Sequence, residues 1–307
     1  MAQLWPVSDL QHAPDLDGFV CAIGVFDGFH KGHQFLIRQV IDEASERGTK
    51  SALITFDHDP DEDFGSPQFR KLMTNECRIE MLADSGVDDV VVLDFSPELA
   101  RLSPHEFLDL FFKQNLPSSV HVGEGFRFGA KGSGNFATLA AWGSERGVRA
   151  LEHDLVIEDG EVISSSRIRE LLASGDLAAA EMLLGHPYEL HSSVVPGRQD
   201  GRAFGIRTAN LEIPTQLLAL KDGVYAAYVL VDGDIYKAAV SVGISPTFER
   251  TTTANIEVHI LDFDGDIYGQ PITVEFKARL RDMRKFGSTD ELIKTITADI
   301  AQTRDLM

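Results

Sequence analysis

The hydrophobic pattern of this chain changes its period once, near residue 188. Before that point, short apolar runs alternate with stretches in which apolar residues recur at helical spacing. The apolar run 19–26 predicts a strand covered on both faces, and Leu36, Val40, Ile41 and Ala44 mark the helix after it. The next patterns predict strands at 51–56, 87–95 and 120–122 and helices at 76–85, 104–113 and 177–184. Strands that alternate with helices indicate a parallel, doubly wound, Rossmann-like α/β sheet.

From Tyr188 onward the apolar residues recur with period two, which is typical of antiparallel strands. The runs 225–231 and 235–242 flank Asp232-Gly233, and the runs 256–263 and 272–280 flank a turn that contains Asp264-Gly265. Both pairs predict β-hairpins, and this number of strands predicts a small antiparallel β-barrel. A C-terminal helix follows, with a possible capping box at Ser288 and Glu291. Pro187 marks the boundary, so we expect domains at 1–186 and 187–307.

Composition narrows the class of protein. The chain has 307 residues, of which 28 are basic and 48 acidic, a formal charge of −20. A general binder of nucleic acid or of anionic membranes usually has the opposite balance, so we expect neither partner. Two cysteines, Cys21 and Cys77, make no disulfide framework, and Cys21 suits core packing. The chain shows neither a signal peptide nor an apolar run of membrane-spanning length, so we expect a cytoplasmic protein; oligomeric state stays open.

The segment from Gly24 to His33 predicts a phosphate site. It reads Gly-Val-Phe-Asp-Gly-Phe-His-Lys-Gly-His and lies where the buried strand turns into a helix. Glycines let the backbone approach a ligand closely, a helix N-terminus offers unpaired N–H groups, and two imidazoles add donors or positive charge. The alternative is that His30 and His33 are ordinary surface residues beside a turn.

A second segment, Ile-Ser-Ser-Ser-Arg-Ile-Arg at 163–169, also indicates an anion. It predicts the start of a helix, with Ser166 as N-cap and Gly175 at its end. Arg167 and Arg169 then occupy the first turn, where the helix dipole disfavours cations. A bound anion would resolve this conflict, although a solvated helix end could also tolerate the arginines.

Both segments resemble motifs of one family. The first resembles the G-x-F-D-G-x-H-x-G-H motif of the FMN adenylyltransferase branch of the HxGH nucleotidyltransferases, and the second resembles the I-S-S-[ST]-x-[IV]-R motif that holds the phosphates of ATP. The resemblance implies that His30, His33 and Arg169 are catalytic. It implies that the remaining matched residues contact ATP: Gly24, Phe26, Asp27, Gly28, Gly32, Ser165 and Ser166.

Two further segments correspond to flavin-side loops of the same family. Phe56-Asp57-His58-Asp59-Pro60 departs from the family's F-[DE]-P-H-P at its middle positions; its polar residues could cap a loop or hold a metal, and a loop cap is the commoner case. The segment 122–129 resembles V-G-x-[DN]-F-x-F-G, with Gly125 at the usual polar position. The resemblance implies flavin contacts at Phe56, Asp57, Phe126, Arg127 and Phe128, although the second loop could also be a packed turn.

The second half resembles the riboflavin kinase module. Residues 205–210 resemble G-[FL]-P-T-A-N, residues 243–248 resemble G-x-x-P-T-[FW], and Glu257 precedes the strand residue His259 as the family's glutamate base does. The resemblance implies magnesium contacts at Thr208 and Asn210 and a catalytic base at Glu257. It further implies ATP contacts at Gly197, Gly201, Arg202 and Gly205 and flavin contacts at Arg281 and Phe286. Arg207 replaces the family's proline.

Together the motifs predict a bifunctional enzyme that phosphorylates riboflavin to FMN and adenylylates FMN to FAD, with ATP as co-substrate and Mg²⁺ as cofactor. Three alternatives stay open. Arg207 motivates an FMN adenylyltransferase with a weakened or inactive kinase-like domain. The others are an HxGH transferase for another acceptor, such as a pantetheine phosphate, and a non-catalytic flavin-binding sensor.

Overall fold

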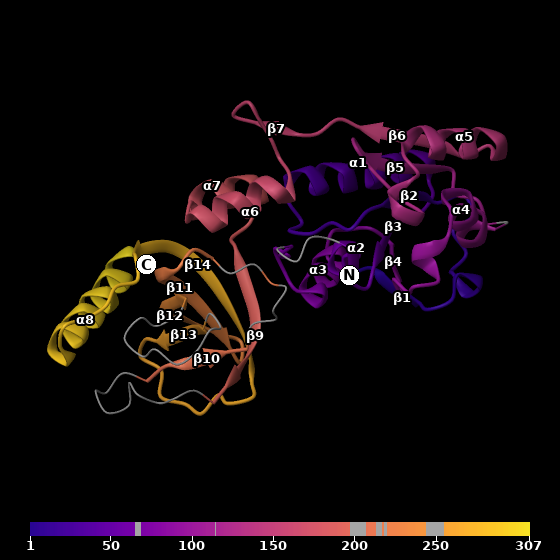
Figure 1. Ribbon diagram of the computed structural model, residues 1–307. Coiled ribbons are helices and arrows are strands. Elements are labelled where there is room, and N and C mark those ends of the chain that lie inside the picture. The colour runs from indigo at the N-terminus through magenta and orange to yellow at the C-terminus, as the bar shows by residue number, and fades with distance from the viewer. Residues whose placement is uncertain (65–68, 114, 197–206, 213–216, 218–219, 244–254) are drawn as a thin grey trace. The chain divides into compact units, whose positions relative to one another are not determined.

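The chain divides into two compact units in its computed structural model (Figure 1). The structure describes residues 1–307 apart from 65–68, 114, 197–206, 213–216, 218–219 and 244–254. The first unit comprises Met1–Phe69 and Asn75–Ser165, and the second comprises Arg70–Thr74 and Ser166–Met307.

The first unit is built on a six-stranded parallel sheet with the strand order β1-β4-β3-β2-β5-β6. The strands are β1 (Gln3–Val7), β2 (Val20–Ile23), β3 (Ser51–Phe56), β4 (Asp89–Leu93), β5 (Ser119–Gly123) and β6 (Arg149–His153). The helices are α1 (Lys31–Arg47), α2 (Pro60–Phe64), α3 (Asn75–Ala83), α4 (Pro104–Phe112) and α5 (Phe136–Arg146). A small hairpin, β7 (Ile157–Glu158) and β8 (Glu161–Val162), follows β6. The predicted doubly wound sheet is confirmed.

Both faces of this sheet are buried because successive residues of each strand enter different cores. Val20 and Ala22 of β2 pack with the apolar residues of α1, whereas Cys21 and Ile23 pack with those of α4 and α5. Cys21 is a core residue, as predicted, and burial raises the pKa of its thiol. In α1 the predicted apolar stripe is buried at Leu36, Val40 and Ala44.

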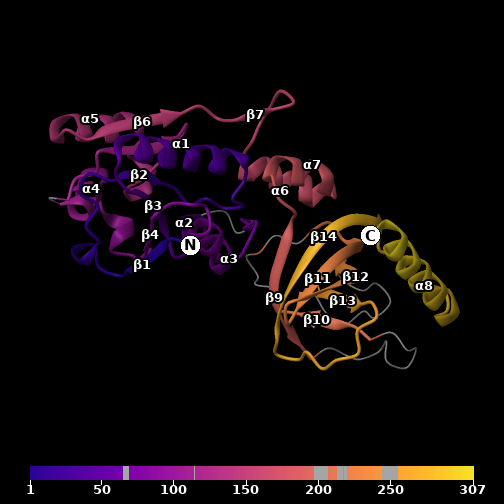
Figure 2. The ribbon, with the colours of Figure 1, turned by 180° about the vertical axis from the view of Figure 1, so that it is seen from behind.

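The second unit is a closed six-stranded barrel with the order β10-β13-β12-β11-β14-β9. Its strands are β9 (Glu189–Val195), β10 (Ala209–Leu211), β11 (Gly223–Val231), β12 (Asp234–Gly243), β13 (Asn255–Ile260) and β14 (Pro271–Arg281). Helices α6 (Ser165–Ser174) and α7 (Leu177–Leu184) precede the barrel, and α8 (Thr289–Leu306) packs against β11 and β12 (Figure 2). The predicted barrel and C-terminal helix are confirmed.

One of the two predicted hairpins is correct. Strands β11 and β12 join through Asp232 (φ 50°) and Gly233 (φ 88°), the two left-handed residues that a tight turn of this kind needs. The predicted hairpin across Asp264-Gly265 is wrong, because β13 pairs with β10 and β12 while β14 pairs with β9 and β11. Neither Asp264 nor Gly265 has a positive φ, and the longer connection 261–270 leads β14 to the other edge of β11.

Candidate active sites

The loop between β2 and α1, residues 24–30, is termed the phosphate loop after its predicted ligand and has an unusual backbone. Phe26 (φ 63°), Gly28 (φ 81°) and Phe29 (φ 39°) all adopt left-handed conformations. Glycine adopts this conformation without cost, but a phenylalanine in it costs about 1–3 kcal/mol. The side chain of Phe26 is 2% exposed and packs in the core below the loop, which holds the strained backbone in place. Strain of this kind is concentrated at ligand-binding loops.

His30 and His33 lie together at the start of α1. His30 is the N-cap, and its Nδ1 accepts the backbone N–H of His33 at 3.3 Å. The two rings stack with their centroids 3.6 Å apart. A neutral His30 therefore carries its proton on Nε2 and is a hydrogen-bond donor there. A Cβ at Gly32 would lie 3.1 Å from the ring of His30, so a larger residue there would force this ring to shift.

His33 is held in its neutral form. Burial of the ring lowers its pKa well below the usual value, and the positive charges of a protonated His30 and of Arg78 lower it further. Its Nδ1 is buried and has no hydrogen-bond partner among the described residues. The site consequently offers polar imidazole atoms beside the free N–H groups of a 17-residue helix, which suits a phosphate.

Arg78 on α3 holds this loop against β3 through hydrogen bonds to both. The sequence patterns did not identify it as a residue of the site. Its side chain is 2% exposed, yet it donates to the carbonyl oxygen of Val25 at 2.9 Å, to Thr55 Oγ1 at 2.7 Å and to the carbonyl oxygen of Phe56 at 2.7 Å. Burial lowers its pKa, while nearby carboxylates, Asp27 first, oppose that shift. A lone arginine inside a helical pattern resembles a solvated surface residue, so only its burial identifies it.

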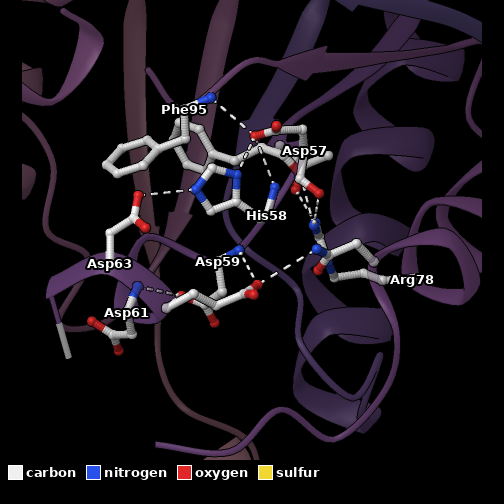
Figure 3. Close-up of polar contacts among 11 residues, drawn as sticks. Asp57, His58, Asp59, Asp61, Asp63, Arg78 and Phe95 are labelled. Carbon is white, nitrogen blue, oxygen red and sulfur yellow. Dashed lines mark hydrogen bonds and ion pairs between the residues drawn. The ribbon is translucent and has the colours of Figure 1, made fainter. Parts of the chain in front are cut away.

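The polar cluster after β3 caps a loop (Figure 3). Asp57 accepts the backbone N–H groups of His58 and Phe95, and Asp59 accepts that of Asp61 at the start of α2. The ring nitrogens of His58 lie 2.8 Å from Asp57 and 3.1 Å from Asp63. Burial alone would lower the pKa of His58, but its hydrogen bonds to Asp63 and Asp57 outweigh burial and raise it. The carboxylates of Asp57 and Asp59 thus make the bonds to backbone N–H groups that are typical of a loop cap.

The aromatic residues predicted to contact flavin occupy two environments. Phe56 is half-buried and meets Phe95 edge to face, with centroids 5.4 Å apart, at the carboxyl ends of β3 and β4. Phe126 is half-buried and stacks on Phe128, which is 8% exposed and lies in the core. Arg127 between them is exposed. Phe128 is therefore primarily a packing residue.

The segment 163–169 begins α6 two residues earlier than predicted. The helix starts at Ser165, so the prediction of Ser166 as N-cap is wrong; Ser166 lies in the first turn and is exposed. Ser165 Oγ donates to the carbonyl oxygen of Asp27 at 2.8 Å, which joins this segment to the phosphate loop. Arg167 pairs with Glu170 on the helix surface at 3.4 Å, and Arg169 is half-buried.

In the barrel, Asn210 and Glu257 lie directly opposite each other on β10 and β13. The residues on either side of Glu257 in β13, Ile256 and Val258, are buried inside the barrel, so Glu257 projects from its outer face. Thr208 precedes Asn210 by two residues and is half-buried. The three side chains provide hydroxyl, amide and carboxylate oxygens, the donor types that magnesium prefers.

Arg207 and the residues of the predicted flavin loop have other partners. Arg207 forms an exposed ion pair with Asp264, and its carbonyl oxygen lies 2.7 Å from Nδ1 of His259. Arg281 donates from Nε and Nη2 to Asp299 at 2.9 and 2.8 Å, which fastens α8 to the barrel. Phe286 is half-buried below Arg284 and Arg281. Four predicted ATP contacts lie outside the described residues: Gly197, Gly201, Arg202 and Gly205.

The described residues contain neither a cluster of metal-ligating side chains nor a helix suited to cross a membrane. No three His, Cys, Asp or Glu side chains in this part of the chain are arranged to hold a metal ion. No helix in it has both the length and the apolar character needed to cross a membrane.

Known families match nearly the whole chain. The family model for FAD synthetase matches residues 12–167, and that for riboflavin kinase matches residues 184–307. The bifunctional riboflavin kinase/FMN adenylyltransferase of Pseudomonas fluorescens is 34% identical over 294 residues, covering 95% of this chain and 94% of the relative. The Haemophilus influenzae protein of the same name is 37% identical over 292 residues, 93% of each chain.

One solved structure has the same fold over the full length. This structure, described as a macrolide-efflux protein from Streptococcus pneumoniae, is 31% identical and superposes with a TM-score of 0.85 over 98% of both chains. Its name gives a different role from the names of the two relatives above, which agree with both family models.

Proposed function

The chain belongs to the family of bifunctional riboflavin kinases/FMN adenylyltransferases, and we propose how its own residues perform the two reactions. The protein phosphorylates riboflavin to FMN with ATP and adenylylates FMN to FAD with a second ATP. The assignment of residues to these reactions follows from the motifs and from the chemistry of their side chains.

Adenylyl transfer is assigned to the phosphate loop, and the stacked pair of His30 and His33 at the start of α1 is the observation that carries this assignment. An oxygen of the FMN phosphate attacks the α-phosphorus of ATP, and the bond from that phosphorus to pyrophosphate breaks. Nε2–H of a neutral His30 and the free N–H groups of α1 donate to the oxygens that gain charge. The motif assigns Ser165, Ser166 and Arg169 to the same phosphates.

Riboflavin phosphorylation is assigned to the outer face of β10 and β13, where Asn210 faces Glu257. Glu257 accepts the proton of the terminal ribityl hydroxyl as its oxygen attacks the γ-phosphorus of ATP and ADP leaves. Thr208 and Asn210 would hold Mg²⁺ through their side-chain oxygens, and the bound ion would neutralise charge on the triphosphate. The predicted contacts of Arg281 and Phe286 with flavin stay part of this proposal, although Arg281 also pairs with Asp299.

Three further features are also proposals. We place the module boundary at residues 186 and 187, which is supported by the riboflavin kinase match beginning at residue 184. We propose a cytoplasmic location because both reactions consume ATP, and cell fractionation tests it. No nucleic-acid or membrane partner is expected from the charge of −20.

Two single-residue variants, each assayed for both reactions, test the assignment of the two sites. Parent, His33→Ala and Glu257→Gln are each given riboflavin, ATP and Mg²⁺, and separately FMN and ATP, and the flavins are separated by chromatography. We expect His33→Ala to form FMN but no FAD. Glu257→Gln should lose about a hundredfold or more in FMN formation while making FAD from supplied FMN. Equal loss of both reactions in a folded variant would contradict two autonomous sites.

A further inference from the structure

A chain of three titratable side chains crosses the first unit outside the phosphate loop. Oε2 of Glu43 on α1 lies 3.1 Å from Nε2 of His121 on β5, and Nδ1 of His121 lies 2.9 Å from Nε2 of His153 on β6. His121 is 1% exposed, whereas His153 is half-buried at the end of its strand. Ser119 and Arg149 each donate to Oε1 of Glu43 at 2.6 Å, which keeps Glu43 a charged acceptor.

These contacts determine which ring nitrogen of His121 and of His153 carries the proton. The carboxylate of Glu43 only accepts, so Nε2 of His121 must carry a proton. His121 is neutral, since burial lowers its pKa to about 4, and its Nδ1 is therefore an acceptor. Nε2 of His153 must then donate to it. Burial also lowers the pKa of His153, so this ring is neutral as well, and its Nδ1 presents a lone pair. No described residue donates a hydrogen bond to that nitrogen.

His153 stands where the base of a nucleotide would reach. The phosphate loop follows β2. Strand β3 lies on one side of β2, and β5 and β6 lie on the other, so the order in which strands are added to the sheet reverses between β2 and β5. Ligands bind at such a switch, beyond the carboxyl ends of the strands. His153 ends β6, about 10 Å across the sheet from β2, a span that a ribose and a purine cover together. Phe35 on α1 is 42% exposed and meets the ring of His153 edge-on, with centroids 6.0 Å apart.

We propose that His153, oriented by Glu43 and His121, selects the adenine base of ATP for adenylyl transfer by accepting a hydrogen bond from its 6-amino group. The exposed ring of Phe35 gives the purine an aromatic surface to pack against. Gly123 is the partner of His153 in the sheet, and beyond its two chain neighbours no atom lies within 4 Å of the place where its Cβ would be, so the strand ends leave room for the base. This inference rests on the proposed assignment of adenylyl transfer to the first unit.

A nucleotide that lacks the 6-amino group tests the hydrogen bond. FAD formation from FMN is measured with ATP and with purine riboside 5′-triphosphate, for the parent, for His153→Leu and for His105→Leu, an exposed histidine on α4. The parent and His105→Leu should prefer ATP by about two- to tenfold in kcat/KM, mainly through KM. His153→Leu should lose this preference. Riboflavin phosphorylation by the same three proteins is the internal control, and its nucleotide preference should not change.

Two results would overturn the inference alone: a parent enzyme that uses both nucleotides equally, or a His153→Leu variant that keeps the parent preference. A parent that makes no FAD from FMN and ATP would instead contradict the adenylyl transfer itself. Nitrogen-15 NMR of the parent gives a test that needs no variant. Nδ1 of His153 should be unprotonated and should shift when a non-hydrolysable ATP analogue binds, and a proton found on Nδ1 would refute the argument.

Discussion

Replacing the buried Arg78 with methionine should strongly lower the free energy of unfolding of the first module. The unbranched methionine side chain fills most of the space of the arginine stem but removes the guanidinium. The carbonyl oxygens of Val25 and Phe56 and the hydroxyl of Thr55 would each lose one buried donor. Asp27, which is 5% exposed, would lose a nearby positive charge. The sites affected are the last residues of β3 and the loop that leads to α1.

The size of the effect follows from burial. Removing one partner from a buried charged network costs about 3–5 kcal/mol, because the groups left behind cannot return to water. For a module of this size each kcal/mol lowers the melting temperature by about 2–4 °C. We therefore expect the melting temperature of the first module to fall by about 6–20 °C. FAD formation should fall with it, and riboflavin phosphorylation should persist at temperatures where the barrel stays folded.

Tryptophan fluorescence measures this module selectively. The chain has two tryptophans, Trp5 and Trp142, and both lie in the first unit. Urea unfolding followed at this signal gives the free energy for parent, Arg78→Met and the control Arg38→Met, an exposed arginine on α1. The control should change stability by no more than about 0.5 kcal/mol. A loss of less than about 1 kcal/mol in Arg78→Met would refute the role given to Arg78.

Three other predictions concern pH, the barrel and the metal. The pKa of His121 falls from 6.5 to about 4 on folding, so between these pH values the unfolded chain binds one more proton than the folded chain. Acidification from pH 6.5 to 4 should therefore lower the free energy of unfolding by about 3 kcal/mol, a loss that His121→Leu should not show, and urea titrations at several pH values check this. Asp299→Asn should destabilise the barrel by about 1.5–3 kcal/mol through its bonds to Arg281, measured by thermal loss of kinase activity. Chelation by EDTA should abolish FMN formation, and Thr208→Val should raise the Mg²⁺ needed to restore it about tenfold.

Local features of the chain could be predicted from its sequence. The loop at 24–33, the stripe on α1 and the turn at Asp232-Gly233 each depend on residues within a few positions of one another, and backbone preferences with period 2 or 3.6 are enough to specify them. The motifs also identified both modules, since their residues lie close together in the chain. The edge strand β1, helix α5 and strand β6 were not predicted, because their patterns are short or mixed.

The tertiary structure decided which distant residues meet. The sequence alone suggested that β13 and β14 form a hairpin, but closure of the barrel pairs each with other strands and sets Asn210 opposite Glu257. Arg78 and the chain from Glu43 to His153 likewise have partners far along the sequence. A local pattern shows which face of an element is apolar. The identity of a buried polar group's partner depends on which elements pack together, and that is determined only when the whole core forms.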